Sequence, residues 1–88
     1  MEINVNESQP TITKYRLLSV TFNLRDVAVD IMYEKGYLDG ESNFVGLGKY
    51  VNAPLVGAEF NQLISAINSS NDIQTTINNA AKLKMGLT

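Results

Sequence analysis

Hydrophobic and polar residues alternate along the first half of the chain, and the alternation changes parity once. Period-two alternation begins at Tyr15: Leu18, Val20, Phe22 and Leu24 fall on even positions, and Val27, Val29, Ile31 and Tyr33 fall on odd positions. Alternation of this kind is typical of strands with one buried face. A reversal of the chain at Arg25-Asp26 predicts a hairpin whose apolar cross-strand pairs share one face: Leu18 with Tyr33, Val20 with Ile31, Phe22 with Val29, and Leu24 with Val27.

The turn is the weak point of this hairpin. Arg25-Asp26 lacks the Asn-Gly or Asp-Gly sequence that a two-residue type I′ turn prefers. A four-residue loop from Leu24 to Val27 would keep the same register with less strain. One long strand with a β-bulge would also change the parity, so this alternative stays open.

The segment YEKGYLDGESNF (residues 33–44) predicts a second turn. Asp39-Gly40 lies in a polar run between two strand-like segments, which is a strong hairpin signal. We expect a third strand over residues 43–52, and we expect Pro54 to end the sheet. Two registers are open for this strand: one places Phe44, Gly46, Gly48 and Tyr50 on the inner face, and the other places Val45, Leu47 and Val51 there and buries Lys49.

After Pro54 the spacing of the apolar residues changes to that of a helix. Gly57 is an acceptable N-cap for this first helix, which should end within residues 68–71. Its apolar residues follow the spacing i, i+3, i+4, i+7 and would share one face: Phe60, Leu63, Ile64 and Ile67.

A second predicted helix follows directly. Asn71 and Gln74 resemble a capping box, Asp72 falls in the first turn, and Gly86 is placed to end the helix. The apolar stripe is modest, which indicates that the helix needs something to pack against: Ile73, Ile77, Ala80, Ala81 and Leu83.

These elements predict an α+β fold, with a three-stranded antiparallel meander followed by two C-terminal helices, at least one of them packed on the sheet. Residues 12–88 would form a single domain. Residues 1–11 are mostly polar, and we expect them to form a flexible N-terminal arm or a segment that orders on a neighbour.

Composition narrows the classes of function. The chain has 88 residues, and its formal net charge of −2 gives no basic patch for a nucleic acid. It contains neither Cys nor His, so disulfides, thiolate metal sites and the commonest general base are excluded. No window approaches the ~18 apolar residues of a membrane span, and MEINVNESQP does not have the pattern of a signal peptide. We expect a protein that is made in a cytoplasm and binds neither membranes nor nucleic acid.

The remaining polar residues form no pattern that predicts catalysis. Lys49 and Tyr50 are neighbours on a strand and should point to opposite faces. Asp26 and Asp30 would lie ~13 Å apart on one strand, too far for a carboxylate pair. Residues 39–43 resemble part of a calcium loop but lack its closing glutamate. We therefore expect no enzyme activity, no catalytic residues, no cofactor and no metal.

Aromatic residues around the second hairpin are the best candidates for a contact surface. Tyrosine is favoured at protein interfaces, and the outer edge of the third strand would be open to pairing with another chain. The predicted interaction residues are Tyr33, Tyr37, Phe44, Tyr50 and Met32.

The sequence YEKGYLDGESNFVGLGKY, followed by GAEFNQLISA, resembles small proteins encoded among the late, structural genes of tailed bacteriophages. The resemblance covers roughly Val27 to Ala66 and lies in a Gly-Tyr-x-Asp turn and a Gly-x-Glu-Phe helix start. It implies a virion- or tail-associated protein that works by assembly, with copies of itself or with other virion proteins. It carries over no catalytic residues. Such a protein would be in the host cytoplasm during synthesis and in the virion afterwards.

A second hypothesis is a small phage-encoded inhibitor or regulatory module that binds one host protein. Both hypotheses fit the size of the chain and its lack of catalytic groups. Stoichiometry separates them, because assembly subunits form large defined oligomers whereas an inhibitor of one target stays small.

Overall fold

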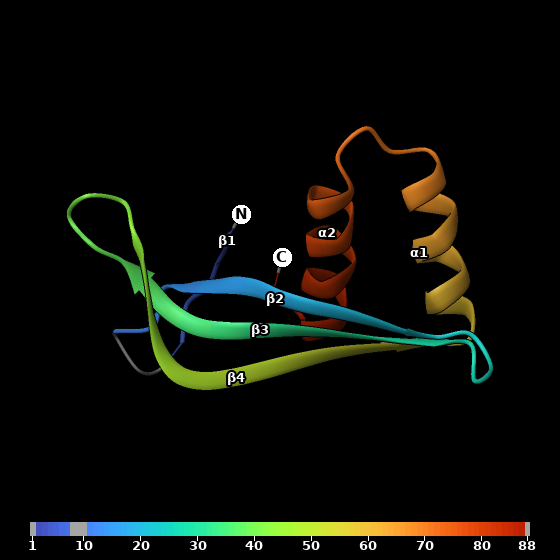
Figure 1. Ribbon diagram of the computed structural model, residues 1–88, viewed down its shortest axis with the longest axis horizontal. Coiled ribbons are helices and arrows are strands. Elements are labelled where there is room, and N and C mark those ends of the chain that lie inside the picture. The colour runs from blue at the N-terminus through green and yellow to red at the C-terminus, as the bar shows by residue number, and fades with distance from the viewer. Residues whose placement is uncertain (1, 8–10, 88) are drawn as a thin grey trace.

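The computed structural model describes residues 2–7 and 11–87. Within these residues, four strands form one antiparallel sheet in the order β1-β2-β3-β4, and two helices follow (Figure 1). The expected α+β class is confirmed, and the sheet has one strand more than the sequence predicts. The elements are β1 (Glu2–Asn4), β2 (Lys14–Asn23), β3 (Ala28–Leu38), β4 (Phe44–Val56), α1 (Ala58–Asn68) and α2 (Ile73–Met85).

The additional strand, β1, lies within the segment that the sequence assigns to an N-terminal arm. It pairs antiparallel with β2, with Ile3 opposite Tyr15. Ile3 is only 3% exposed and belongs to the core, so the core begins well before residue 12. Residues 1 and 8–10 of the predicted arm lie outside the described residues.

The first hairpin is confirmed, including its four-residue turn over residues 24–27. The alternative of one long bulged strand is wrong. Val20 lies opposite Ile31 and Phe22 lies opposite Val29, as predicted. One predicted pair is wrong, because a register shift between Leu17 and Ser19 places Leu17, not Leu18, opposite Tyr33. Leu24 and Val27 face each other as the ends of the turn, where the backbone nitrogen of Val27 lies 3.4 Å from the Leu24 carbonyl oxygen.

Strand β4 is longer than predicted and runs through Pro54, which lies opposite Asp30. The expectation that Pro54 ends the sheet is wrong. Because β4 is an edge strand, a residue without an N–H is tolerated there.

The register of β4 follows the second predicted alternative, since Leu47 and Val51 pack against the core, and the first alternative is wrong, since Phe44 and Tyr50 lie on the outer face. Lys35 pairs with Lys49 whereas Gly36 pairs with Gly46, so β4 accommodates an irregularity where Gly48 has a φ of 69°. Beyond it, Val51 packs against the core as the second register requires. Lys49 lies on the same face as Val51, as that register requires, but its side chain is exposed, because the helices cover the other end of the sheet.

Both helices lie on the same face of the sheet, over the end near the β2–β3 turn (Figure 1). The first helix ends as predicted, and its N-cap is Gly57. Phe60 and Leu63 are its buried residues, and Ile64 and Ile67 pack against the core.

The N-cap of the second helix lies one residue after the predicted one. Its N-cap is Asp72, whose carboxylate accepts a hydrogen bond from the backbone N–H of Thr75 at 3.1 Å, so the assignment of Asn71 is wrong. Gly86 ends the helix with a φ of 76°. Ile77 and Ala81 are buried as expected, whereas Ile73 and Leu83, which the predicted stripe includes, are 54% and 73% exposed.

The core lies between the sheet and the helices. Its largest fully buried side chains are Tyr33, Ile31, Leu63 and Val29. The hydroxyl of Tyr33 donates a 2.6 Å hydrogen bond to Oδ1 of Asn78, a buried residue of α2. This bond connects the central strand to α2 and satisfies two polar groups that would otherwise be costly to bury. Burial also raises the pKa of Tyr33 well above its ordinary value.

Candidate protein-interaction site

The structure does not bring the five predicted interaction residues into one exposed patch. Tyr33 is fully buried on the inner face of β3, so it is unavailable for contact with a partner. Tyr37, Phe44 and Met32 are half-buried, and Tyr50 is 55% exposed. Period-two alternation shows which residues share a face, but it does not show which face the helices cover.

Tyr50, Met32 and Phe44 lie on the outer face of the sheet, where charged residues surround them. Tyr50 lies opposite Glu34, and the guanidinium of Arg16 lies 4.6 Å from the centre of the Phe44 ring. Arg16 also forms a 3.2 Å ion pair with Glu34. This face therefore resembles the ordinary solvent-facing side of an antiparallel sheet.

The outer edge of β4 is a weaker docking edge than the sequence predicts. Pro54 interrupts the row of backbone donors, and the irregularity around Gly48 disturbs the strand further along. Both features are common devices that protect edge strands from pairing with another chain.

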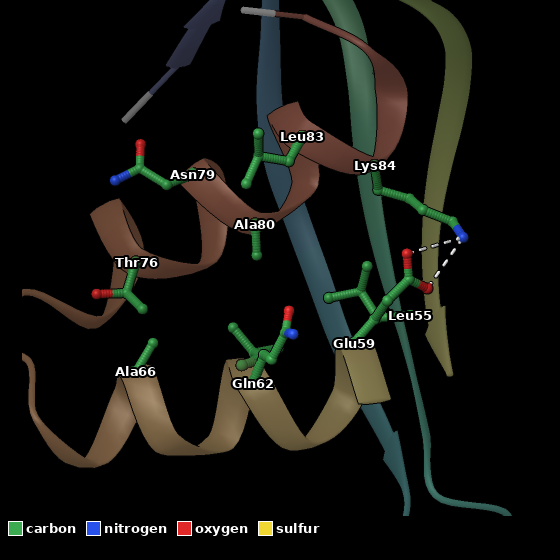
Figure 2. A pocket seen from close by; sticks show the side chains of 10 residues that line it. Leu55, Glu59, Gln62, Ala66, Thr76, Asn79, Ala80, Leu83 and Lys84 are labelled. Carbon is green, nitrogen blue, oxygen red and sulfur yellow. Dashed lines mark hydrogen bonds and ion pairs between the residues drawn. The ribbon is translucent and has the colours of Figure 1, made fainter. Parts of the chain in front are cut away.

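A groove of about 440 Å³ lies between α1 and α2. Leu55 of β4 and Leu63 of α1 are buried and line it, and Leu83 of α2 lines it as an exposed side chain. Ala66 of α1 and Ala80 of α2 point into the space between the two helices (Figure 2). Because alanine side chains are short, they leave this space unfilled. The result is a concave surface whose lining is part apolar and part polar, with Gln62, Thr76 and Asn79 among its residues.

An ion pair closes one end of the groove beside β4 (Figure 2). Nζ of Lys84 lies 3.0 and 3.2 Å from the two carboxylate oxygens of Glu59, and the hydrogen bond from Lys84 lowers the pKa of Glu59. The groove thus combines apolar and uncharged polar lining residues with one charge of each sign at a defined position.

The turn over residues 24–27 is the second prominent feature. Leu24 is 75% exposed, the most exposed of the large hydrophobic side chains among the described residues. The backbone N–H of Asp26 donates to Oδ1 of Asn23 at 3.2 Å, and Nδ2 of Asn23 donates to Asp26 at 2.9 Å. The backbone N–H of Gly57 donates to the carbonyl of Val27 at 3.0 Å. The turn is therefore held in one conformation while its leucine faces solvent.

The same end of the sheet carries further exposed apolar residues. Phe22, Val27 and Val56 are 43%, 38% and 56% exposed, and the last paired row of this end joins Asn23, Ala28 and Val56. Phe22 is anchored from below by an edge-to-face contact with Phe60, at 6.3 Å between ring centres. Phe22 faces the helices, whereas Val56, which pairs with Ala28, lies on the opposite face, so these residues share one end of the sheet but not one continuous surface.

A cluster of titratable groups holds the N-terminal segment on the inner face. Glu7 accepts a hydrogen bond from the hydroxyl of Tyr15 and forms a 3.0 Å ion pair with Lys35. The Tyr15 hydrogen bond and the Lys35 charge lower the pKa of Glu7, whereas burial and this carboxylate raise the pKa of Tyr15. The cluster explains how a short β1 stays in place, and its partners are internal to the chain.

The sequence does not reveal the groove or the exposed turn as sites. The only signals were the poor turn sequence at Arg25-Asp26 and the modest apolar stripe of the second helix, in which Leu83 is included. The turn sequence does not show that Leu24 is exposed, and the stripe does not show that Leu83 borders a groove. Both facts depend on where the helices pack.

No protein-family model, curated protein sequence or solved structure matches the chain. Within residues 2–7 and 11–87, no group of three acidic, His or Cys residues is placed to hold a metal ion. Neither helix is long and apolar enough to cross a membrane.

Proposed function

We propose that the chain is a non-enzymatic assembly subunit that acts through protein–protein contacts, with copies of itself and with other subunits of a larger particle. The phage-type, virion- or tail-associated role that the sequence resemblance implies is the biological setting of this proposal. Its action would consist of binding and positioning, and no residue would have a catalytic role.

The observation that carries the proposal is the exposure of Leu24 and Leu83, at 75% and 73%. Covering one leucine side chain completely contributes about 1.5–3 kcal/mol. Neither leucine contributes much to the fold of the isolated chain. Their exposure is therefore best explained by a contact made in an assembly.

Burial of the two leucines alone does not offset the free-energy cost of association. Association costs an estimated 4–15 kcal/mol in lost freedom of motion, which two leucines at about 1.5–3 kcal/mol each offset only in part. A stable contact must also cover the apolar residues next to Leu24 and satisfy the charges beside Leu83. We therefore expect association that weakens on dilution, unless several contacts close a ring.

Light scattering over a dilution series tests the proposal. We expect a mass that exceeds that of one chain at high concentration, and Leu83→Ser should reduce it. Ile73→Ser is the matched control, because Ile73 is also an exposed apolar residue of α2 but does not line the groove. A mass equal to one chain at every concentration would contradict self-assembly and would favour a module that binds a single host protein.

A further inference from the structure

We infer that copies of the chain associate head to tail, with the turn over residues 24–27 of one copy seated in the groove between α1 and α2 of the next. This inference rests on the proposed function, since it identifies the contact through which self-assembly occurs.

The two surfaces complement each other in shape. The turn is a narrow projection that ends in one exposed leucine, and the bonds of Asn23 and Gly57 hold its backbone in place. The groove is concave where Ala66 and Ala80 leave room, and half of its ten lining residues are apolar, so it can cover a leucine side chain. A rigid projection loses little conformational freedom on binding, which favours the contact.

A chain does not fill its own groove. No residue of its turn is among those that line the groove. The bond between Gly57 and Val27 fixes the turn at the base of α1. The groove is therefore available to the turn of a second copy.

The charges complement each other as well. Arg25 and Asp26 are adjacent at the tip of the turn, and Arg25 forms no ion pair with the described residues. Glu59 and Lys84 present opposite charges at one end of the groove, and the Glu59 side chain is 43% exposed. Arg25 of one copy would approach Glu59 of the next while Asp26 approaches Lys84. Paired opposite charges of this kind set the orientation of a contact more than its strength.

The contact joins two different surfaces, so its symmetry is heterologous. Each added copy brings a free turn and a free groove, and repetition gives a closed ring or an open filament, depending on the rotation between neighbours. A symmetric dimer formed groove to groove would leave Leu24 exposed and is the main rival arrangement.

Cysteine cross-linking tests the contact directly, because the natural chain contains no cysteine. A chain with Arg25→Cys is mixed with a tagged chain with Gln62→Cys, since Gln62 lines the groove. We expect a mixed disulfide dimer under mild oxidation. Thr21→Cys replaces Arg25→Cys in the control mixture, because Thr21 is exposed on β2 outside the turn. All three positions are exposed, so the fold is retained. Equal cross-linking in both mixtures, or none in either, would overturn the inference.

A mixing experiment separates this inference from the proposed function. Leu24→Asp removes the turn as a ligand, and Ala66→Arg fills the groove. We expect each variant alone to have the mass of one chain and the mixture to form a dimer that grows no further. If the natural chain self-associates and Leu24→Asp keeps its mass, the head-to-tail contact is wrong and assembly stands. If the natural chain is monomeric at every concentration, the head-to-tail contact and the proposed self-assembly are both wrong.

Discussion

The backbone at Val27 has a φ of 52°, in a region that β-branched residues rarely adopt. Such a conformation costs of order 1–3 kcal/mol and persists only where the surrounding structure enforces it. Here the hydrogen bond from Gly57 to the Val27 carbonyl holds it. The conformation of this turn therefore lowers the free energy of unfolding.

Replacing Val27 with Asn should make the protein more stable. Asn tolerates a positive φ far better than Val, and Val27 is 38% exposed, so little burial is lost. We expect Val27→Asn to raise the free energy of unfolding by about 1 kcal/mol in urea titrations. Val56→Asn, at an exposed strand position, is the control and should lower it slightly. A loss of stability in Val27→Asn would contradict a strained turn.

The buried hydrogen bond between Tyr33 and Asn78 should contribute to the stability of the fold. Tyr33→Phe keeps the ring but leaves the buried Oδ1 of Asn78 without its donor. We expect unfolding free energy to fall by about 1–3 kcal/mol. Tyr50→Phe should change it little, because Tyr50 is 55% exposed. Equal effects of the two substitutions would show that the buried bond adds nothing.

Among the elements, the β3–β4 pairing depends on a close backbone approach at Gly36. A Cβ atom at this position would collide with the carbonyl oxygen of Val45 and lie 2.6 Å from the Phe44 ring. We expect Gly36→Ala to destabilise the protein by about 1–3 kcal/mol. A Cβ at Gly40 would meet nothing within 4 Å, so Gly40→Ala should be neutral or slightly stabilising. Thermal denaturation of both variants distinguishes the two sites.

The start of α2 gives a prediction with a defined pH dependence. The N–H and hydroxyl of Thr75 bond to the Asp72 carboxylate and lower its pKa. A lowered pKa in the folded state contributes stability above the ordinary pKa and loses it as the pH falls through the lowered one. We expect Asp72→Ala to lower the thermal midpoint by a few degrees at pH 7 and by much less once the pH is below the lowered pKa of Asp72.

Asn71→Ala is the matched control for the cap. Its side chain is exposed and is not the N-cap of α2, so the thermal midpoint should stay within about a degree of the natural chain. A large loss in Asn71→Ala with little change in Asp72→Ala would contradict Asp72 as the cap and would assign that role to Asn71.

The elements that the sequence predicts well are those whose pattern is local. Alternation over many residues determined the β2–β3 hairpin, and the spacing around Phe60 and Leu63 determined the buried face of α1. Strand β1 was missed because three residues cannot show a period. The shift at Leu18 moves one residue out of register, and no neighbouring Gly or Pro marks it.

Other features depend on the arrangement of elements and could not be predicted. Whether Pro54 ends β4 or sits within it depends on β4 being an edge strand. Asn71 and Asp72 are both capable caps, and the path of the chain selects between them. The groove requires that Ala66 and Ala80 face each other, which follows only from the packing of the two helices.

The molecule as a whole is small, and a chain of this length buries only about 60–65% of its unfolded surface. Small domains of this kind often gain stability from association. Exposed apolar surface lies at two distinct places, the turn over residues 24–27 and the groove between α1 and α2. Association that covers both would stabilise the fold and build an assembly at the same time.

Hydrogen–deuterium exchange of the natural chain, compared between concentrated and strongly diluted solutions, tests this account most directly. We expect slower exchange at high concentration in peptides that cover the turn over residues 24–27 and the groove walls of α1 and α2. The peptide over residues 48–52 on β4 should not change. Protection confined to β4 and the outer face around Tyr50, or no concentration dependence anywhere, would contradict assembly through the turn and the groove.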